Sequence, residues 1–290
     1  MSSKGRVFPP TVPIAILFAA KAFAKQLSQH AIPISTTQYC GLVALNDGNV
    51  ATSVGSLAKK AGLTPSAMTT AMQEIAEKGL VERMVDDEDR RIIRLQITPK
   101  GQELMRDLDP VILQTIANIC YGLDNVACRT IFEAAFRTAC SVGDVHMRNH
   151  RSRVDSAYVF MTLMFKSDLT RISDLHRLHL MESIALCYLE EQDEPVRSCD
   201  LAKSMLYHPC SLAKMHPSLI KRGLLRGVTK TGDKRALWLS LTPEGKERAA
   251  HVRADFERLL GENPALAQRG KRAIVIEASK MIVRTQQWHL

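Results

Sequence analysis

The sequence predicts a mostly helical protein with small β-hairpins, in which one folded unit occurs twice. The first observation is an internal repeat: residues 57–101 and 201–245 align at a constant offset of 144 residues, with 12 identities over 45 positions. The second is composition, because aromatic residues make up only 5% of the chain, which favours helices packed through aliphatic side chains. The third is the order of helix and turn signals within each copy. A long repeat of this kind indicates two copies of one supersecondary unit.

The N-terminal segment holds an apolar run from Val12 to Ala20 after a basic start. A secretory signal is one interpretation, but Pro13 lies inside the run and Lys21 interrupts it before the small-residue site. An amphipathic first helix is the other, because Ile14 and Leu17 have helical spacing. We favour the helix. No run reaches the roughly 18 apolar residues that a membrane span requires.

Caps and breakers then predict three helices in the first copy. A short helix at 37–46 ends at an Asn-Asp-Gly turn, and Ser53 begins a second helix that Gly62 ends. Thr64-Pro65 starts the third, because a hydroxyl cap followed by proline at the first helical position is a strong start signal. Gly79 closes that helix. Two helices joined by so short a turn predict a helix-turn-helix.

A β-hairpin is predicted directly after Gly79. Its first strand leads to a charged tip at 86–91, and its second alternates apolar and polar residues through Ile93, Leu95 and Ile97. Thr98-Pro99 starts the next helix with the same cap and proline. A helix-turn-helix followed by such a hairpin is a winged helix.

The residues of the wing carry a family resemblance. Asp89-Arg90-Arg91, Leu95 and the segment Ile97-Thr98-Pro99-Lys100-Gly101 resemble the wing-and-exit signature of the MarR family of bacterial transcriptional regulators. The first repeat resembles that family over roughly Val12 to Cys140. The second repeat matches from about Ala157 onward.

The second copy repeats the signature as Asp233-Lys234-Arg235 and as the segment Leu239 to Gly245. We therefore expect one repeat at 1–145, with its winged helix at about 35–100, and a second at 146–290, with its winged helix at about 179–244. Members of the family pair as homodimers through helices near both chain ends. The resemblance thus implies a covalent pseudo-dimer with a pseudo-twofold helical dimerisation-like region between the repeats.

The resemblance also implies double-stranded operator DNA as the partner, with a recognition helix in each major groove and a wing in each flanking minor groove. In the first repeat the predicted DNA-binding residues are Pro65, Ser66, Thr69, Thr70, Gln73, Asp89, Arg90 and Arg91. Ser, Thr and Gln side chains can bond base edges or phosphates. Arg90 suits a narrow minor groove, and Asp89 and Arg91 would pair to hold the wing. The acidic residues 86–88 fit this interpretation poorly unless they point into solvent.

The second repeat departs from the pattern inside its predicted recognition helix, Pro209 to Arg222. Pro217 lies in the interior of that helix, where proline removes a hydrogen bond and kinks the chain, and Leu206 replaces Gly62 of the first turn. We expect a helix that is bent, shortened or devoted to another task, and phosphate binding without close reading of sequence would fit it. A solvated basic face is the alternative. The predicted DNA-binding residues here are Ser211, Lys214, Asp233, Lys234 and Arg235.

Charge divides the two halves. The chain carries +9 overall, of which residues 1–145 contribute 15 Lys+Arg against 14 Asp+Glu, and residues 146–290 contribute 24 against 16. The excess positive charge therefore belongs to the second repeat, as phosphate binding by that repeat requires.

Other chemistry is weakly signalled. The seven cysteines are scattered and form no Cys-x-x-Cys pair, which is typical of a reduced, cytoplasmic protein. Cys210 opens a predicted helix in basic surroundings, where a redox switch and a passive thiol are both open interpretations. The histidines lack the spacing of a metal site. No nucleophile motif or phosphate-binding loop appears, so we predict neither an enzyme, nor a metal site, nor a resident cofactor.

The function we expect is sequence-specific transcriptional regulation by operator occupancy, tuned by an unidentified small-molecule effector. The chain would act as a monomeric pseudo-dimer, with further dimerisation left open. The alternative is a winged-helix protein-interaction module or anti-repressor that has lost sequence-specific DNA binding. The sequence does not specify the operator, the effector or the direction of regulation.

Overall fold

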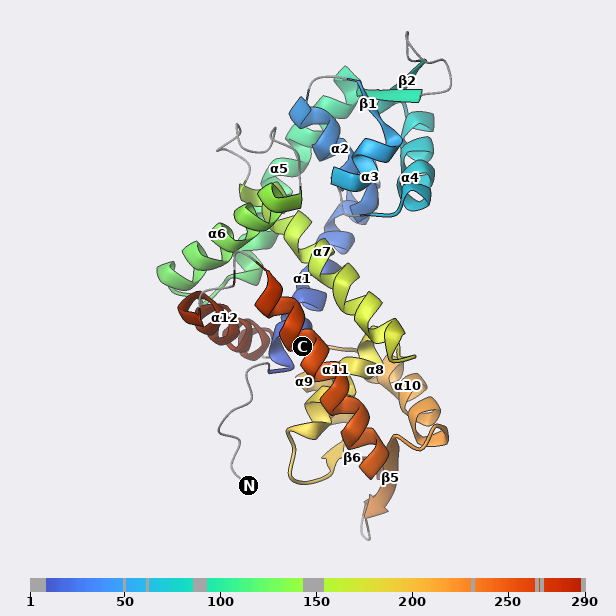
Figure 1. Ribbon diagram of the computed structural model, residues 1–290, viewed down its shortest axis with the longest axis vertical. Helices are drawn as coiled ribbons and strands as arrows, with labels where there is room; N and C mark the ends of the chain where they lie inside the picture. Colours follow the sequence, from blue (N-terminus) through green and yellow to red (C-terminus); the bar gives the residue numbers. More distant parts are fainter. Residues whose placement is uncertain are drawn as a thin grey trace. The chain divides into compact units, whose positions relative to one another are not determined.

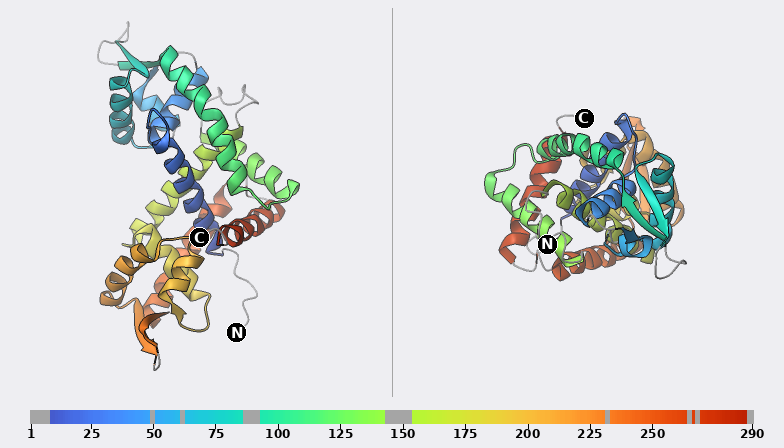
Figure 2. Two further views of the ribbon diagram at one scale, coloured as in Figure 1. Left: turned by 180° about the vertical axis from the view of Figure 1, so that it is seen from behind. Right: turned by 90° about the horizontal axis from the view of Figure 1, so that it is seen from above.

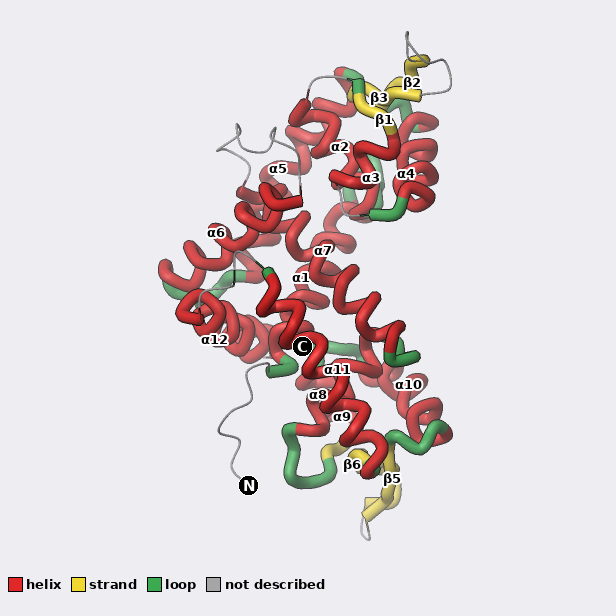
Figure 3. The backbone as a smooth tube through the Cα atoms, viewed as in Figure 1, coloured by secondary structure: helices red, strands yellow, loops and turns green. Residues whose placement is uncertain are grey.

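The computed structural model is mostly helical, with small antiparallel sheets among the residues that it describes (Figures 1 and 3). The chain separates into two compact units. The first combines the residues up to Phe18 with Tyr121–Thr130 and Phe165–Leu290, and the second combines Ala19–Cys120 with Ile131–Met164. Each unit therefore draws segments from both halves of the sequence. The described residues are 9–48, 51–60, 63–85, 93–142, 154–230, 233–263, 266 and 269–287.

The second unit contains a helix-turn-helix and a hairpin from the first half of the chain. Its elements in order are α2 (Thr36–Gly48), β1 (Thr52–Ser53), α3 (Val54–Lys60), α4 (Pro65–Glu77), β2 (Val81–Val85), β3 (Ile93–Ile97) and α5 (Pro99–Ile119). The strands form an antiparallel sheet in the order β1–β3–β2. In the hairpin, Val81 pairs with Ile97 and Val85 with Ile93. The hairpin follows α4 directly in the chain (Figure 2).

Local signals explain why α4 begins where the sequence predicts. Thr64 Oγ1 accepts a hydrogen bond from the Ala67 amide at 3.3 Å, and Pro65 occupies the first turn. One face of the helix is buried at helical spacing through Met68, Ala71, Met72 and Ile75. The cap and the apolar stripe therefore specify the same helix.

The first unit contains the same order of elements from the second half of the chain. They are α8 (Leu180–Glu190), β4 (Val196–Arg197), α9 (Ser198–Ser204), α10 (Pro209–Lys221), β5 (Leu225–Lys230), β6 (Asp233–Leu241), α11 (Pro243–Glu262) and α12 (Arg269–Gln287). The strands again form an antiparallel sheet, in the order β4–β6–β5. β4 and β1 thus each join the hairpin as a short third strand.

The helix α10 corrects one part of the expectation for Pro217, the shortening of the helix. The helix is not shortened: it runs unbroken from Pro209 to Lys221 and has 13 residues, as many as α4. Pro217 and Ala213 are both exposed, so the backbone hydrogen bond that the proline removes lies on the solvent-facing side of the helix. Leu212 and Leu219 are buried on the other face. Packing of that face holds the helix through the proline.

The turn before α10 also differs from expectation in its backbone. Leu206, which aligns with Gly62, is nearly buried and adopts a φ of 50°, the left-handed region that glycine prefers. The Tyr207 amide donates to the Ala202 carbonyl at 2.9 Å, and the aligned Leu63 amide donates to the Ala58 carbonyl at 2.9 Å. The turn closes in the same way in both copies, although Gly62 itself lies outside the described residues.

The exit from each hairpin repeats its hydrogen bonds at the offset of 144 residues. Thr98 Oγ1 donates to the Gly79 carbonyl at 2.8 Å, and Thr242 Oγ1 donates to the Gly223 carbonyl at 2.6 Å. The same hydroxyls accept from the backbone amides of residues 101 and 245 at 3.1 and 3.0 Å. These bonds fix the start of α5 and α11 against the glycine just beyond the end of α4 and α10, respectively.

Gly101 and Gly245 are required by close approach of the backbone. A Cβ at Gly101 would lie 2.2 Å from the Leu80 carbonyl oxygen, and a Cβ at Gly245 would lie 2.0 Å from the Leu224 carbonyl oxygen. Real Cβ atoms do not approach so near. The signature Thr-Pro-x-Gly is therefore a packing requirement in both copies.

The remaining helices are α1 (Thr11–Gln29), α6 (Asn125–Val142) and α7 (Val154–Leu175). The predicted amphipathic first helix is present as α1. Within the second unit the ring of Phe23 lies edge-on to the ring of Tyr158, with centroids 6.0 Å apart. Within the first unit Thr11 Oγ1 lies 3.0 Å from Ser279 Oγ. Helical segments from the two halves of the chain therefore pack together inside each unit.

Candidate nucleic-acid interface

The exposed surface of α4 carries two neighbouring rows of side chains at helical spacing. Stripe 1 of α4 consists of Ser66, Thr69 and Gln73, and stripe 2 of α4 consists of Ala67, Thr70, Glu74 and Glu77. All seven side chains are exposed, as is Pro65 at the helix start. Residues three, four and seven apart lie on one helix face, so each stripe is a continuous row. The five residues predicted on this helix thus share one solvent-facing surface.

The hydroxyls on α4 are set to accept hydrogen bonds rather than to donate them. Thr69 Oγ1 donates to the Pro65 carbonyl at 2.8 Å, and Thr70 Oγ1 donates to the Ser66 carbonyl at 3.3 Å. The oxygen lone pairs remain available outside the helix. Gln73 adds a side-chain amide, which offers a donor and an acceptor together, the pair that recognises adenine in a major groove. Stripe 1 of α4 therefore has base-reading chemistry.

Bonds to the preceding elements hold α4 in place. Lys78 Nζ, just after the helix, donates to the Pro33 carbonyl at 2.6 Å. The buried Gln38 side chain donates through Nε2 to the Glu74 carboxylate and accepts from the Ser35 amide at 2.9 Å. Pro33, Ser35 and Gln38 all lie just before α2 or in its first turn. The helix is therefore anchored through Lys78 and through Glu74, which is itself an exposed member of stripe 2, while the remaining stripe residues face solvent.

The first wing has an apolar surface near its tip. Val85 and Ile93 are cross-strand partners and are 61% and 38% exposed, and the adjacent Met84 is 45% exposed. The predicted wing contacts Asp89, Arg90 and Arg91, like the acidic residues 86–88, lie outside the described residues. Their roles remain predictions.

The exposed surface of α10 carries the same two rows with different side chains. Stripe 1 of α10, at the positions aligned with stripe 1 of α4, consists of Cys210, Ala213 and Pro217. Stripe 2 of α10 consists of Ser211, Lys214, Ser218 and Lys221. All seven residues are exposed. The predicted contacts Ser211 and Lys214 thus lie together on stripe 2, while Asp233, Lys234 and Arg235 belong to strand β6.

An ion pair between Arg222 and Glu182 anchors α10. The aligned residues of the first copy, Lys78 and Gln38, anchor α4. Arg222 donates through Nη1 to Glu182 at 3.1 Å and through Nη2 to the Arg177 carbonyl at 2.6 Å. Glu182 is buried and also accepts from the His179 amide at 3.0 Å. Arg222 aligns with Lys78. The structure thus uses Arg222, the last residue of the predicted recognition helix, to fix that helix.

The inner face of α10 differs from that of α4 at one titratable position. His216 is buried at the position aligned with Met72. Burial lowers the pKa of His216 from its ordinary value of 6.5, because the charged imidazolium loses solvation. The thiol of Cys210 is exposed, and its backbone amide donates to His208 Nδ1 at 3.3 Å.

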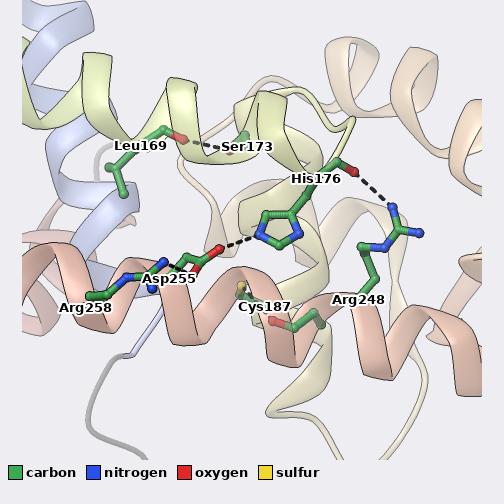
Figure 4. A network of polar contacts seen from close by, with 8 residues as sticks. Leu169, Ser173, His176, Cys187, Arg248, Asp255 and Arg258 are labelled. Atoms are coloured by element: carbon green, nitrogen blue, oxygen red, sulfur yellow. Dashed lines mark hydrogen bonds and ion pairs between the residues drawn. The ribbon is translucent and has the colours of Figure 1, made fainter.

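A polar network fixes the entry to the second helix-turn-helix (Figure 4). His176 Nε2 lies 2.8 Å from Asp255 Oδ2 on α11, and Arg248 donates to the His176 carbonyl at 2.9 Å. Asp255 also pairs with Arg258. The network joins the end of α7 to α11 within the first unit. His176 therefore has a structural setting that its spacing in the sequence did not reveal.

Other kinds of site lack support in the described part of the chain. No group of three His, Cys, Asp or Glu side chains there converges to hold a metal ion. Among the described helices, none combines the length and apolar character needed to cross a membrane.

Comparison with known proteins identifies the first winged helix. Residues 34–93 match the MarR family, a family of DNA-binding transcriptional regulators, so the chain carries a MarR family domain there. BldR from Sulfolobus solfataricus is similar over 38% of this chain and 77% of its own, with 29% identity and a TM-score of 0.35. AbsC, a MarR family transcriptional regulator from Streptomyces coelicolor, is similar over 43% and 86%, with 19% identity and a TM-score of 0.38. CouR from Rhodococcus jostii RHA1, bound to p-coumaroyl-CoA, is similar over 47% and 92%, with 16% identity and a TM-score of 0.39.

Proposed function

We propose that this chain is a DNA-binding transcriptional regulator that works as a covalent pseudo-dimer of two MarR-like repeats. The observation that carries the proposal is the exposed recognition surface of α4 inside the MarR family domain at residues 34–93. Ser66, Thr69 and Gln73 form a continuous row that projects hydrogen-bonding groups into solvent. That row has the dimensions and chemistry of a helix that reads base edges in a major groove.

Two further observations support a second DNA-binding head. The hydrogen bonds of the hairpin exit and of the helix turn recur at an offset of 144 residues, so α10 is presented on the same scaffold as α4. The exposed lysines Lys214 and Lys221 give α10 the positive charge that binds phosphate. Both heads would then contact one duplex.

The composition of the two compact units supports the pseudo-dimer. Each unit mixes segments of both halves, as Phe23 with Tyr158 and Thr11 with Ser279 illustrate. In a homodimer such contacts would join two chains, and here they join two repeats of one chain. Covalent linkage removes the translational cost of dimerisation and lets the repeats diverge.

Regulation by a small-molecule effector belongs to the same proposal. The effector would bind the DNA-free and DNA-bound forms with different affinity, because only such a difference shifts an equilibrium between them. A coupling of about 1–3 kcal/mol is typical of such systems. Release of the bound duplex by members of a metabolite panel, followed by fluorescence anisotropy, would identify the effector.

The DNA-binding proposal is tested by selecting duplexes from a library with a long randomised segment at low salt. We expect an enriched sequence that the full-length chain binds with strongly salt-dependent affinity, since phosphate contacts release counterions. Light scattering should give the mass of one chain per duplex. Absence of enrichment and of any affinity at low salt would refute DNA binding.

A second candidate function is protein binding by the first winged helix. The exposed Val85–Ile93 pair favours it, as do Glu74 and Glu77, the only ionised residues in the sequence of α4. Under this alternative the duplex selection fails. A specific cellular protein would instead be retained by the wild-type chain and lost by the Val85→Asp variant.

A further inference from the structure

The outer stripes of α4 and α10 carry different chemical groups and opposite charge. The α4 sequence has Glu74 and Glu77 and no Lys or Arg, whereas α10 has Lys214 and Lys221 and no Asp or Glu. The formal charge therefore changes from −2 on α4 to +2 on α10. Because both helices have 13 residues and follow the same short turn, these differences occupy equivalent positions on the two helices.

Stripe 1 has lost its base-reading groups on α10. Ser66, Thr69 and Gln73 of α4 become Cys210, Ala213 and Pro217 at the aligned positions of α10. Alanine and proline side chains have no hydrogen-bonding group, and a thiol is only a weak one. All three residues are exposed, and they are the only members of this row. A bidentate contact with a base edge cannot be made from stripe 1 of α10.

Stripe 2 has gained the groups that bind phosphate. Thr70 and Glu77 of α4 align with Lys214 and Lys221 of α10, and Glu74 aligns with Ser218. Lys214 and Lys221 are seven residues apart, about 10.5 Å along one helix face. A lysine that binds a phosphate does so as a point charge, and that contact carries no information about the base beside it. Stripe 2 of α10 is thus a row for holding the DNA backbone.

The two helices are anchored at aligned positions although their outer side chains differ. Lys78 bonds the Pro33 carbonyl and Arg222 bonds the aligned Arg177 carbonyl, both at 2.6 Å. A helix that had lost all contact with DNA would not need to keep this position. The conserved placement together with the new charge favours a different mode of DNA contact over loss of contact.

We infer that the chain binds an asymmetric duplex in which α4 reads the bases of one half-site and α10 holds the phosphates of the other. This inference rests on the DNA-binding function proposed above. Gln73 is the principal specificity-determining residue, since it alone on stripe 1 of α4 presents a donor and an acceptor on separate atoms, as a bidentate contact with adenine requires. Lys214 and Lys221 supply affinity that does not depend on sequence.

The test combines duplex selection with hydroxyl-radical footprinting of the wild-type chain on the selected site. We expect base preference confined to one half-site and backbone protection across both. A selected site with twofold symmetric base preference would overturn the inference while leaving the proposed function intact. Absence of binding to any duplex would overturn both, so the two failures are distinguishable.

Two variants measure the two modes separately. Gln73→Ala should reduce discrimination at one base pair by roughly 5- to 150-fold, the range for loss of one bidentate contact, with the salt slope unchanged. The double variant Lys214→Ala/Lys221→Ala should weaken all duplexes equally and lower the salt slope by about two units. Base preferences that change with the lysines, or a salt slope that does not change, would contradict the assignment.

A matched control removes two lysines from elsewhere on the surface. Lys166→Ala/Lys280→Ala deletes the same charge from α7 and α12 and should leave the base preferences and the footprint unchanged. Its salt slope should fall by less than that of the α10 variant, because direct phosphate contacts dominate the slope. An equal fall in both double variants would attribute the effect to net charge and overturn phosphate binding by α10. Circular dichroism confirms that each variant remains folded.

Discussion

The first and second helix-turn-helix segments share the hydrogen bonds of their turns and hairpin exits but present surfaces of opposite charge. α4 and α10 have equal lengths, similar turns before them and the same threonine bonds after them. Stripe 1 nevertheless changes from amide and hydroxyl groups to a thiol and two side chains without a hydrogen-bonding group, and stripe 2 exchanges its carboxylates for lysines and serine hydroxyls. The difference shows that backbone geometry and surface chemistry are separable, because exposed side chains contribute little to the fold.

The comparison extends to the inner faces. α4 is anchored through Gln38 and Lys78, whereas α10 is anchored by the buried Glu182 and by Arg222. One anchor depends on a neutral amide at its buried end, and the other depends on a buried carboxylate. The two copies should therefore respond differently to the same kind of mutation.

The largest expected effect comes from the hairpin exits. Gly101→Ala and Gly245→Ala should each destabilise their own winged helix by about 3 kcal/mol, because the new Cβ would overlap a backbone carbonyl that cannot move freely. Hydrogen exchange of the amides in each winged helix measures the two losses separately. Gly55→Ala is the control, since a Cβ there meets nothing within 4 Å. A neutral result for either exit variant would break the equivalence of the two copies.

Mutation of the two anchoring cations should destabilise the two copies by different amounts. Arg222→Ala should cost about 2 kcal/mol, because it leaves the buried Glu182 carboxylate without its cation. Lys78→Ala should cost about 1 kcal/mol or less, since the carbonyl it leaves can bond water. Denaturant unfolding followed by hydrogen exchange tests the order. Equal losses would mean that the ion pair adds nothing beyond the shared carbonyl contact.

Pro217 provides a smaller test in the opposite direction. Pro217→Gln installs the residue found at the aligned position of α4 and restores the amide that can bond the Ala213 carbonyl. We expect stabilisation of about 1 kcal/mol, which is less than the full cost of an interior proline because the missing hydrogen bond lies on the solvent-facing side of the helix. Thermal unfolding is the measurement. A loss of stability would show that the proline fits α10 without strain.

The smallest expected effect depends on pH. Burial lowers the pKa of folded His216 below 6.5, so the unfolded chain binds a proton more readily, and stability should fall as the pH falls below about 6.5. His216→Met, which copies Met72, should remove this part of the acid sensitivity. The reciprocal Met72→His should create it in the first copy. Urea midpoints at several pH values measure both, and unchanged pH profiles would contradict the assignment.

Sequence reasoning located most of the fold because its signals are local. The Thr-Pro caps at residues 64–65 and 98–99 act within a single helical turn, and the alternation of Ile93, Leu95 and Ile97 reports a strand directly. The exposed positions on α4 also followed from helical spacing. The role of Arg222 did not, because its partner Glu182 lies 40 residues away and nothing local marks the pair.

The sequence by itself determined the repeat, the order of helices and strands, the caps and the composition of each exposed stripe, since these depend on residues close together in the chain. Only the tertiary structure decided that α10 continues through Pro217, because burial of Leu212 and Leu219 outweighs a local preference against proline. It also decided which cations face solvent and which anchor a helix. Lys214 and Arg222 are both cations of the same predicted helix, and the sequence does not distinguish their roles. The fold does, because it brings the buried carboxylate of Glu182 into contact with Arg222.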